Sequence, residues 1–333
     1  MTPPAAITPT AELPIFAVNE GKVISRQDLL ARMGEARVIY LGEKHDNPTQ
    51  HQLQREIIQN LVEMGKRPAI GLEFFSRAQT SWLLNFTEAK QSPMKGSAAE
   101  SSHASLSHEG ESLRQRLGWE QRPEWDFYYP LILVARHKKL PVFGADLPQG
   151  MRFHITRVGM SGISPVERAL IPSTGFVHED YRQLMQKQLS EAHCGAAAPD
   201  LLDRLYATWV ARNDTMAASI TAMLKELPSS EPIVMILGAG HVARDMGVLE
   251  RVAHLNPGVR QLNLGFKEIS ASPATSDFAT YQQPVQVGNT RFAPDHGYLW
   301  FTPPAPATDA PDQDPCALFR KRHPPVSEKP SPS

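Results

Sequence analysis

One stretch, residues 38–51 (VIYLGEKHDNPTQH), most narrows the folds that this chain can adopt. Its first four residues are apolar or aromatic, which is typical of a strand buried on both faces of a parallel sheet. Asn47 and Pro48 then provide an N-cap and a first helical position, and apolar residues recur at helical spacing until Gly65. A short buried strand followed directly by a helix indicates an α/β chain.

The same alternation continues along the chain. Four further apolar runs predict strands, at residues 68–75, 140–146, 232–237 and 261–266. Two segments have helical periodicity, at residues 125–135 and 200–227. Strands that alternate with helices predict an α/β fold with a mainly parallel, open sheet and helices on both of its faces.

Three segments lack such a pattern. Residues 1–12 are rich in Pro and Ala and predict a flexible N-terminus. Residues 87–118 are rich in Ser, Gly, Glu and His with little periodicity, and we interpret them as a mobile surface insertion. The Pro- and Ser-rich residues 323–333 predict a disordered tail.

The composition of the 333 residues excludes several classes of protein. A net charge of −1 provides no basic excess for binding nucleic acid. No run of 18 apolar residues occurs, so we expect no transmembrane segment. The first residues have the pattern of neither a signal peptide nor a lipobox, which favours a cytoplasmic location. Cys194 and Cys316 could form one disulfide in an oxidising compartment and should be free in the cytoplasm.

Ionisable side chains follow several of the predicted strands. Glu43 and His45 follow the first strand, and Glu73, Asp146 and His241 each end or follow another. Each residue alone is more typical of a loop carboxylate or a helix cap. Because the carboxyl ends of parallel strands meet at one edge of a sheet, we expect these groups to share a site. Imidazoles and carboxylates are ligands for divalent metals and also serve as general acids and bases.

Glycines precede both histidines by three residues, in GEKH at 42–45 and GAGH at 238–241. A glycine lets the chain turn sharply out of the sheet and bring the imidazole back over its edge. The second motif also matches a loose dinucleotide fingerprint, GxGxxA. However, the next strand offers Asn263 where an acidic residue would bind ribose, so we do not favour nicotinamide binding.

Arg212 lies on the apolar stripe of the predicted helix 200–227, three residues after Trp209 and four before Met216. A buried guanidinium needs a partner, and we expect Glu43 or Glu73 to provide it. Extension of the side chain to solvent along the helix surface is an equally good explanation of the spacing.

Several short motifs together resemble the ChaN family, the haem-binding uptake branch of the superfamily that also contains Tiki proteases, TraB proteins and erythromycin esterases. They are LGEKHDN at 41–47, GLE at 71–73, GADLP at 144–148, ARNDTMA at 211–217, GAGHV at 238–242 and DPC at 314–316. The resemblance extends over residues 13–322, which we therefore expect to form one ChaN-like domain.

The resemblance implies a mainly parallel α/β fold with a helical subdomain, in a bacterial protein of iron or haem acquisition. The site residues that it implies are Glu73, His241, His45 and Arg212. In Tiki relatives the corresponding histidines and glutamate support metal-dependent peptide cleavage, and in esterase relatives they support hydrolysis. ChaN proteins are commonly lipoproteins, so the resemblance implies a periplasmic or membrane-anchored location, although this chain shows no lipobox.

The chain departs from the ChaN pattern at two positions. Asn213 stands where ChaN proteins often have Asp, and Asp146 stands where Asn is common. Both substitutions alter the charge of the implied site.

We consider two functions. The first is haem or iron binding without turnover, with haem as the cofactor and Tyr128 and Tyr129 as candidate haem contacts. These tyrosines are more typical of core aromatic residues. The chain could also form a homodimer, which the sequence does not decide.

The second function is metal-dependent hydrolysis of a peptide or ester bond. Glu43, His45, Glu73 and His241 would bind a divalent ion or activate water, and Arg212 would stabilise an oxyanion.

Overall fold

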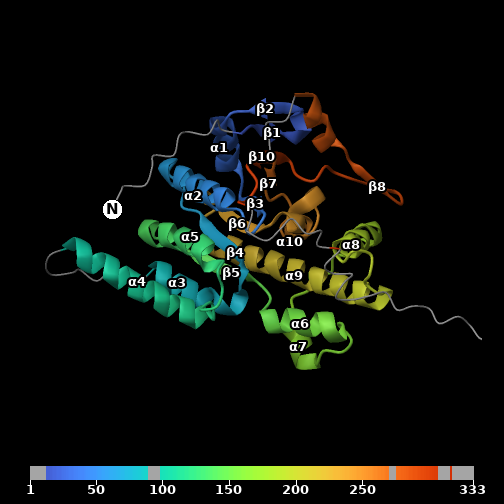
Figure 1. The fold of residues 1–333 in the computed structure, drawn as a ribbon, viewed down its shortest axis with the longest axis horizontal. Coiled ribbons are helices and arrows are strands. Elements are labelled where there is room, and N and C mark those ends of the chain that lie inside the picture. Colours follow the sequence, from blue (N-terminus) through green and yellow to red (C-terminus); the bar gives the residue numbers. More distant parts are fainter. Residues whose placement is uncertain (1–12, 89–97, 270–274, 307–315, 317–333) are drawn as a thin grey trace, which may run out of the picture.

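A computed structural model of the protein describes residues 13–88, 98–269, 275–306 and Cys316. Its centre is a sheet of eight strands with helices on both faces (Figure 1). The strands of this sheet are β1 (Ile15–Ala17), β2 (Lys22–Ile24), β3 (Val38–Glu43), β4 (Ala69–Ser76), β5 (Val142–Asp146), β6 (Ile233–Gly238), β7 (Gln261–Glu268) and β10 (Tyr298–Thr302). A separate hairpin pairs β8 (Val285–Val287) with β9 (Thr290–Phe292).

Helices alternate with the strands as the sequence predicts. The α-helices are α1 (Arg26–Glu35), α2 (Pro48–Glu63), α3 (Thr80–Glu88), α4 (Ala98–Leu117), α5 (Trp125–Lys138), α6 (Gln149–Val158), α7 (Pro165–Ala169), α8 (Glu179–Ala192), α9 (Pro199–Glu226) and α10 (Val248–Leu255). The 3-10 helices are η1 (Val18–Glu20), η2 (Arg77–Gln79), η3 (Ala239–Asp245) and η4 (Thr275–Gln282). Helix α2 begins as predicted, because the Asn47 side chain accepts the backbone N–H groups of Thr49 and Gln50.

The strand order is β2-β1-β10-β7-β3-β6-β4-β5. The six strands from β10 to β5 are parallel, and β1 and β2 extend one edge in antiparallel fashion. Strand β3 lies between β7 and β6 with all six of its residues buried. The prediction of a mainly parallel, open sheet is confirmed, and its most apolar strands occupy the centre because helices cover both of their faces.

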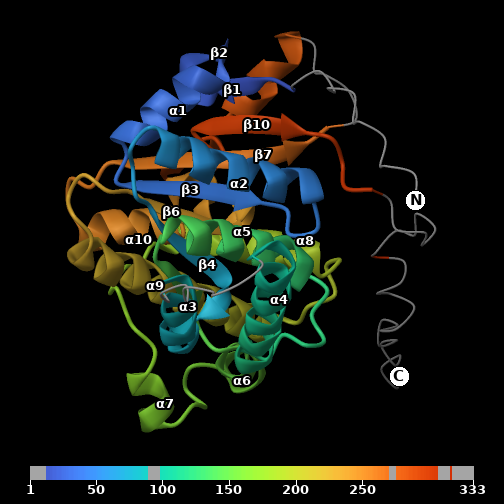
Figure 2. The same ribbon diagram turned by 90° about the vertical axis from the view of Figure 1, so that its left-hand side faces the viewer.

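Different helices cover the two faces of the sheet. Helices α1, α2 and α5 pack on one face and form the larger core, and Figure 2 looks onto this side of the molecule. Helices α9 and α10 pack on the other face, where Met216 and Ile220 of α9 contact the sheet. Helix α9 also carries α6 and α8 on its outer side, and these helices correspond to the helical subdomain that the resemblance implied.

The prediction of a mobile insertion at residues 87–118 is wrong for much of this segment. Helix α3 continues to Glu88, and residues 98–117 form α4. Leu113 and Leu117 of α4 are buried in the larger core. The sequence pattern is weak because few large apolar residues anchor this helix, and both of these lie in its C-terminal half.

Both predicted disordered ends, residues 1–12 and 323–333, lie outside the described residues, and the single domain over residues 13–322 stays a prediction. Cys194 and Cys316 form a disulfide that links positions 122 residues apart. Within the described part of the chain, no helix combines the length and the apolar character needed to cross a lipid bilayer.

Candidate functional site

A cleft of about 840 Å³ opens at the carboxyl edge of the sheet. His45, which follows β3, and Glu73 and Phe74 of β4 line its sheet side, and Arg212 of α9 lines it from the helical side. Helices α3 and α4 with the loop after α4 form one wall, and α6 forms the other. The cleft therefore lies where open α/β sheets bind ligands, and its volume is typical of a small-molecule site.

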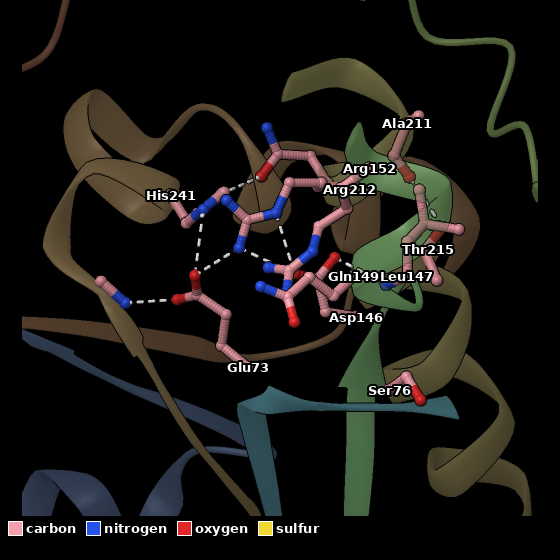
Figure 3. A network of polar contacts seen from close by, with 12 residues as sticks. Glu73, Ser76, Asp146, Leu147, Gln149, Arg152, Ala211, Arg212, Thr215 and His241 are labelled. Atoms are coloured by element: carbon pink, nitrogen blue, oxygen red, sulfur yellow. Dashed lines mark hydrogen bonds and ion pairs between the residues drawn. The ribbon is translucent and has the colours of Figure 1, made fainter. Parts of the chain in front are cut away.

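Arg212 pairs with two carboxylates from neighbouring strands (Figure 3). Its Nη2 atom lies 2.5 Å from Glu73 Oε1, and its Nε atom donates to Asp146 Oδ2 over 2.8 Å. The expected pairing of Arg212 is confirmed for Glu73, and Glu43 is not its partner. The alternative of an arginine extended into solvent is wrong, because only 19% of the side chain is exposed.

Asp146 accepts from a second guanidinium. Arg152 of α6 donates to Asp146 Oδ2 over 3.0 Å, so this carboxylate bridges α6 and α9. Asp146 is buried, and the two arginines supply its counter-charges. Asp146, which stands where ChaN proteins commonly have Asn, thus adds a negative charge that Arg152 and Arg212 balance.

Glu73 is held ionised by its surroundings. Its Oε2 atom accepts the backbone N–H of Gly238 over 2.6 Å, and its Oε1 atom lies 3.4 Å from His241 Nε2. Burial opposes ionisation, but the neighbouring His241, Arg212 and His45 outweigh it and hold the pKa of Glu73 well below its ordinary value.

His241 is a buried partner of Glu73 and does not line the cleft. Its ring stacks on Trp209 with centroids 4.1 Å apart, and its Nδ1 atom lies 2.7 Å from Asn213 Oδ1. Burial lowers the pKa of His241 despite the nearby carboxylate of Glu73. This histidine therefore positions Glu73 and is screened from any ligand in the cleft.

Glu43 and His45 form a second network. His45 Nδ1 donates to Glu43 Oε1 over 3.0 Å, and the buried Glu43 carboxylate also accepts from the Tyr128 hydroxyl and the Gln54 amide. The His45 side chain remains 41% exposed and lines the cleft. Burial opposes protonation of His45, but the hydrogen bond to Glu43 and the charges of Glu73 and Glu43 outweigh it and raise its pKa. With Nδ1 engaged, Nε2 is the ring nitrogen left for a ligand.

The structure gives the predicted metal site no support. Within the described residues, no group of three or more His, Cys, Asp or Glu side chains is arranged to hold a metal ion. Three of the four predicted ligands are already engaged. The Glu43 carboxylate accepts hydrogen bonds from three donors, and the Glu73 carboxylate pairs with Arg212. The His241 ring is buried against Trp209. The strand ends converge as expected, but their side chains separate into two networks, one built on Glu43 and one on Glu73.

The two tyrosines proposed as haem contacts do not line the cleft. Tyr128 is 1% exposed and directs its hydroxyl at Glu43. Tyr129 is partly buried and stacks on Trp125 with ring centroids 4.9 Å apart. Both tyrosines pack as core residues, which was the alternative interpretation of their sequence.

Sequence reasoning missed several residues of these networks, among them Arg152 and Gln54. Arg152 lies at the start of α6, in a region without a clear pattern, and no sequence signal points to it. Gln54 faces Glu43 from α2, one turn after Gln50, and helical spacing alone does not distinguish it from the other glutamines of this helix. Asp146 was recognised as a strand-end group but not as a partner of Arg212.

Comparisons with known proteins identify the family of the chain and solved structures with a similar fold. Residues 29–252 match the family described as haem-binding uptake, Tiki superfamily, ChaN. The fold is similar to that of ChaN of Campylobacter jejuni, whose structure is described as showing cofacial haem binding, with a TM-score of 0.61 and 17% identity over 86% of this chain and 96% of that one. An erythromycin esterase EreC mutant matches with a TM-score of 0.43 and 14% identity over 85% of this chain and 83% of its own. Among curated proteins, none matches the chain in sequence.

Proposed function

Because the chain belongs to the haem-binding uptake family ChaN of the Tiki superfamily, we propose that it binds haem in the cleft at the carboxyl edge of the sheet. We further propose that it serves a bacterial system of haem or iron acquisition, and that it binds without turnover. The observation that carries this proposal is the imidazole of His45, which reaches the cleft while Glu43 holds its other nitrogen.

The residues that line the cleft fit a porphyrin. Trp82 and Phe153 offer aromatic surface and are 40% and 66% exposed, and Phe74 and the buried Trp119 also line the cleft. Haem iron accepts an imidazole as an axial ligand, and a ligating histidine usually donates its second N–H to a carboxylate or carbonyl. His45 and Glu43 provide this pair.

The backbone at Gly238 sets the place of the imidazole. A Cβ atom at this position would lie 3.0 Å from both Cε1 and Nε2 of His45. The glycine therefore lets β6 pass close to the ring, and a larger residue would press on the imidazole and displace it. The GAGH motif contributes to the site through its first residue as well as through His241.

Haem titration tests the proposal. We expect sub-stoichiometric haem to give a shifted Soret band with the wild-type protein, and the His45→Ala variant to lose the spectral signature of axial histidine. His137→Ala removes an exposed histidine of α5 and should bind as the wild type does. A wild-type spectrum that equals that of free haem would contradict the proposal.

Hydrolysis is a second candidate, because the same Glu43–His45 pair resembles an oriented general base beside Arg212. Its metal-dependent form lacks a ligand set among the described residues. Metal analysis of protein purified without chelator, together with a panel of peptides and esters, tests it. Turnover that is lost in His45→Ala but kept in His137→Ala would favour this function.

A further inference from the structure

The cleft carries more positive charge than its own carboxylates balance. Four arginines line it, namely Arg116, Arg122, Arg152 and Arg212, against one lining carboxylate, Glu73. Glu73 and the buried Asp146 pair with Arg212 and Arg152. Among the described residues, neither Arg116 nor Arg122 has a carboxylate within ion-pairing distance, so two of the charges that line the cleft remain without an anion.

The loop that presents Arg122 has a defined shape. The guanidinium of Arg114 donates to the backbone carbonyls of Trp119 over 3.0 Å and Glu120 over 3.1 Å. This anchors the loop to the last turns of α4, next to Arg116. The Arg122 side chain then donates to the neutral Gln149 of α6 over 2.6 Å, which positions the guanidinium but leaves its charge unbalanced.

We propose that Arg116 and Arg122 form a carboxylate-binding rim that holds the acid side chains of a porphyrin seated in the cleft. This inference rests on the proposed haem function and deepens it. A guanidinium binds a carboxylate with two parallel hydrogen bonds, and such charge-assisted pairs are among the stronger polar contacts. Trp119 lies in the same loop as Arg122 and also lines the cleft, and its ring packs in the core beneath. This packing fixes the loop that presents the Arg122 cation to the acid groups.

The rim and His45 recognise different parts of the ligand, and this separates their tests. Iron-free protoporphyrin IX has the ring and both acid groups but offers no metal to an imidazole. Its binding should depend on the two arginines and not on His45. The dimethyl ester of the same porphyrin keeps the ring and loses both negative charges, so it should bind weakly to every variant.

The experiment titrates the full-length protein with iron-free protoporphyrin IX and with its dimethyl ester, and follows quenching of tryptophan fluorescence. We expect the double variant Arg116→Gln, Arg122→Gln to bind the diacid at least about tenfold more weakly than the wild type. Arg157→Gln, Arg291→Gln is the matched control, because both arginines are exposed and neither lines the cleft. His45→Ala should bind the diacid as the wild type does.

The outcomes distinguish the two proposals. If the wild type binds haem and diacid but the rim variant matches the control, or if the diester binds as tightly as the diacid, the rim inference is wrong and haem binding stands. If the wild type binds neither haem nor diacid, both proposals fail. Weaker binding of the diacid with rising salt in the wild type and in the control, but not in the rim variant, would further support the rim.

Discussion

Arg212 is held by two carboxylates that reach it from different strands. Glu73 comes from β4 and Asp146 from the end of β5, while Arg212 itself lies on α9. Its guanidinium therefore connects the sheet edge to the helix that covers it. Removing the charge would take the guanidinium away from Glu73 and leave Asp146 with Arg152 alone.

We predict that Arg212→Met lowers the free energy of unfolding by on the order of 3 kcal/mol, because one member of a largely buried ion pair is lost. The double variant Arg212→Met, Glu73→Gln should recover part of this loss, since it also removes the stranded carboxylate. Thermal melting of both variants measures the effect, with the exposed Arg157→Met as control. A melting curve of Arg212→Met equal to that of the wild type would rule out the pairing.

His296 should make the protein sensitive to mild acid. Burial lowers the pKa of His296 to about 4, whereas an unfolded histidine titrates near 6.5. The unfolded chain therefore takes up the proton first, so this contribution to stability is complete above pH 6.5 and is lost as the pH falls toward 4. The difference corresponds to about 3 kcal/mol.

Urea denaturation at pH 7 and pH 4.5 measures this effect. His296→Gln keeps a polar side chain near Asn263, which lies 2.9 Å from the ring, but cannot titrate. We expect this variant to lose less stability between the two pH values than the wild type. Equal losses in both proteins would show that His296 is not responsible.

Helix α4 shows how tertiary packing can stabilise a segment with a weak sequence pattern. Its residues described in full, 108–117, include two buried leucines that contact the larger core. Arg114 and Leu117 of the same turns connect the helix to the loop and cleft wall beyond it. The proposed haem site therefore depends on a helix that local periodicity does not predict.

We predict that Leu113→Ala destabilises the protein by about 2–4 kcal/mol, because the removed side chain leaves a cavity in the core. Gln115→Ala, on the exposed side of the same helix, should change stability by less than about 0.5 kcal/mol. Chemical denaturation compares the two variants. Equal stabilities would mean that α4 does not pack as the structure describes and would support the mobile insertion.

The disulfide between Cys194 and Cys316 joins distant parts of the chain. It links the turn after α8 to a residue beyond the last strand, and it closes a loop of 122 residues. Such bonds persist in oxidising compartments, so the location outside the cytoplasm that the family resemblance implies stays a prediction, and the redox state of this pair in the cell tests it.

Reduction of this bond should lower the free energy of unfolding by about 2–5 kcal/mol, because it frees a long loop in the unfolded state. Denaturation with and without a reducing agent measures the effect, and Cys316→Ser should be insensitive to the agent. Thiol counting on denatured protein from native-host extract, protected against oxidation, tests the location. Two free thiols would place the protein in a reducing compartment.

Local sequence patterns were sufficient to predict the sheet and the edge at which the site lies. Strand β3, the cap of α2 at Asn47, the place of Glu73 in the last half of β4 and that of His241 just after β6 all follow from patterns within a few residues. Parallel strands end at one edge, so the convergence of these groups is a consequence of strand type alone. The strands, the helix start and the edge of the sheet are predictable because hydrophobic periodicity, helix capping and turn chemistry are local properties of the chain.

Which groups touch one another depended on long-range packing. The contacts of Arg212 with Asp146 and Glu73 span 66 and 139 residues, and that of Tyr128 with Glu43 spans 85. Such partners depend on loop lengths, helix rotation and packing, and many arrangements share the same local patterns. For this physical reason local patterns identified most members of the site, while the fold separated them into two networks. It left His45, Glu73 and Arg212 lining the cleft and buried Glu43 and His241 behind them.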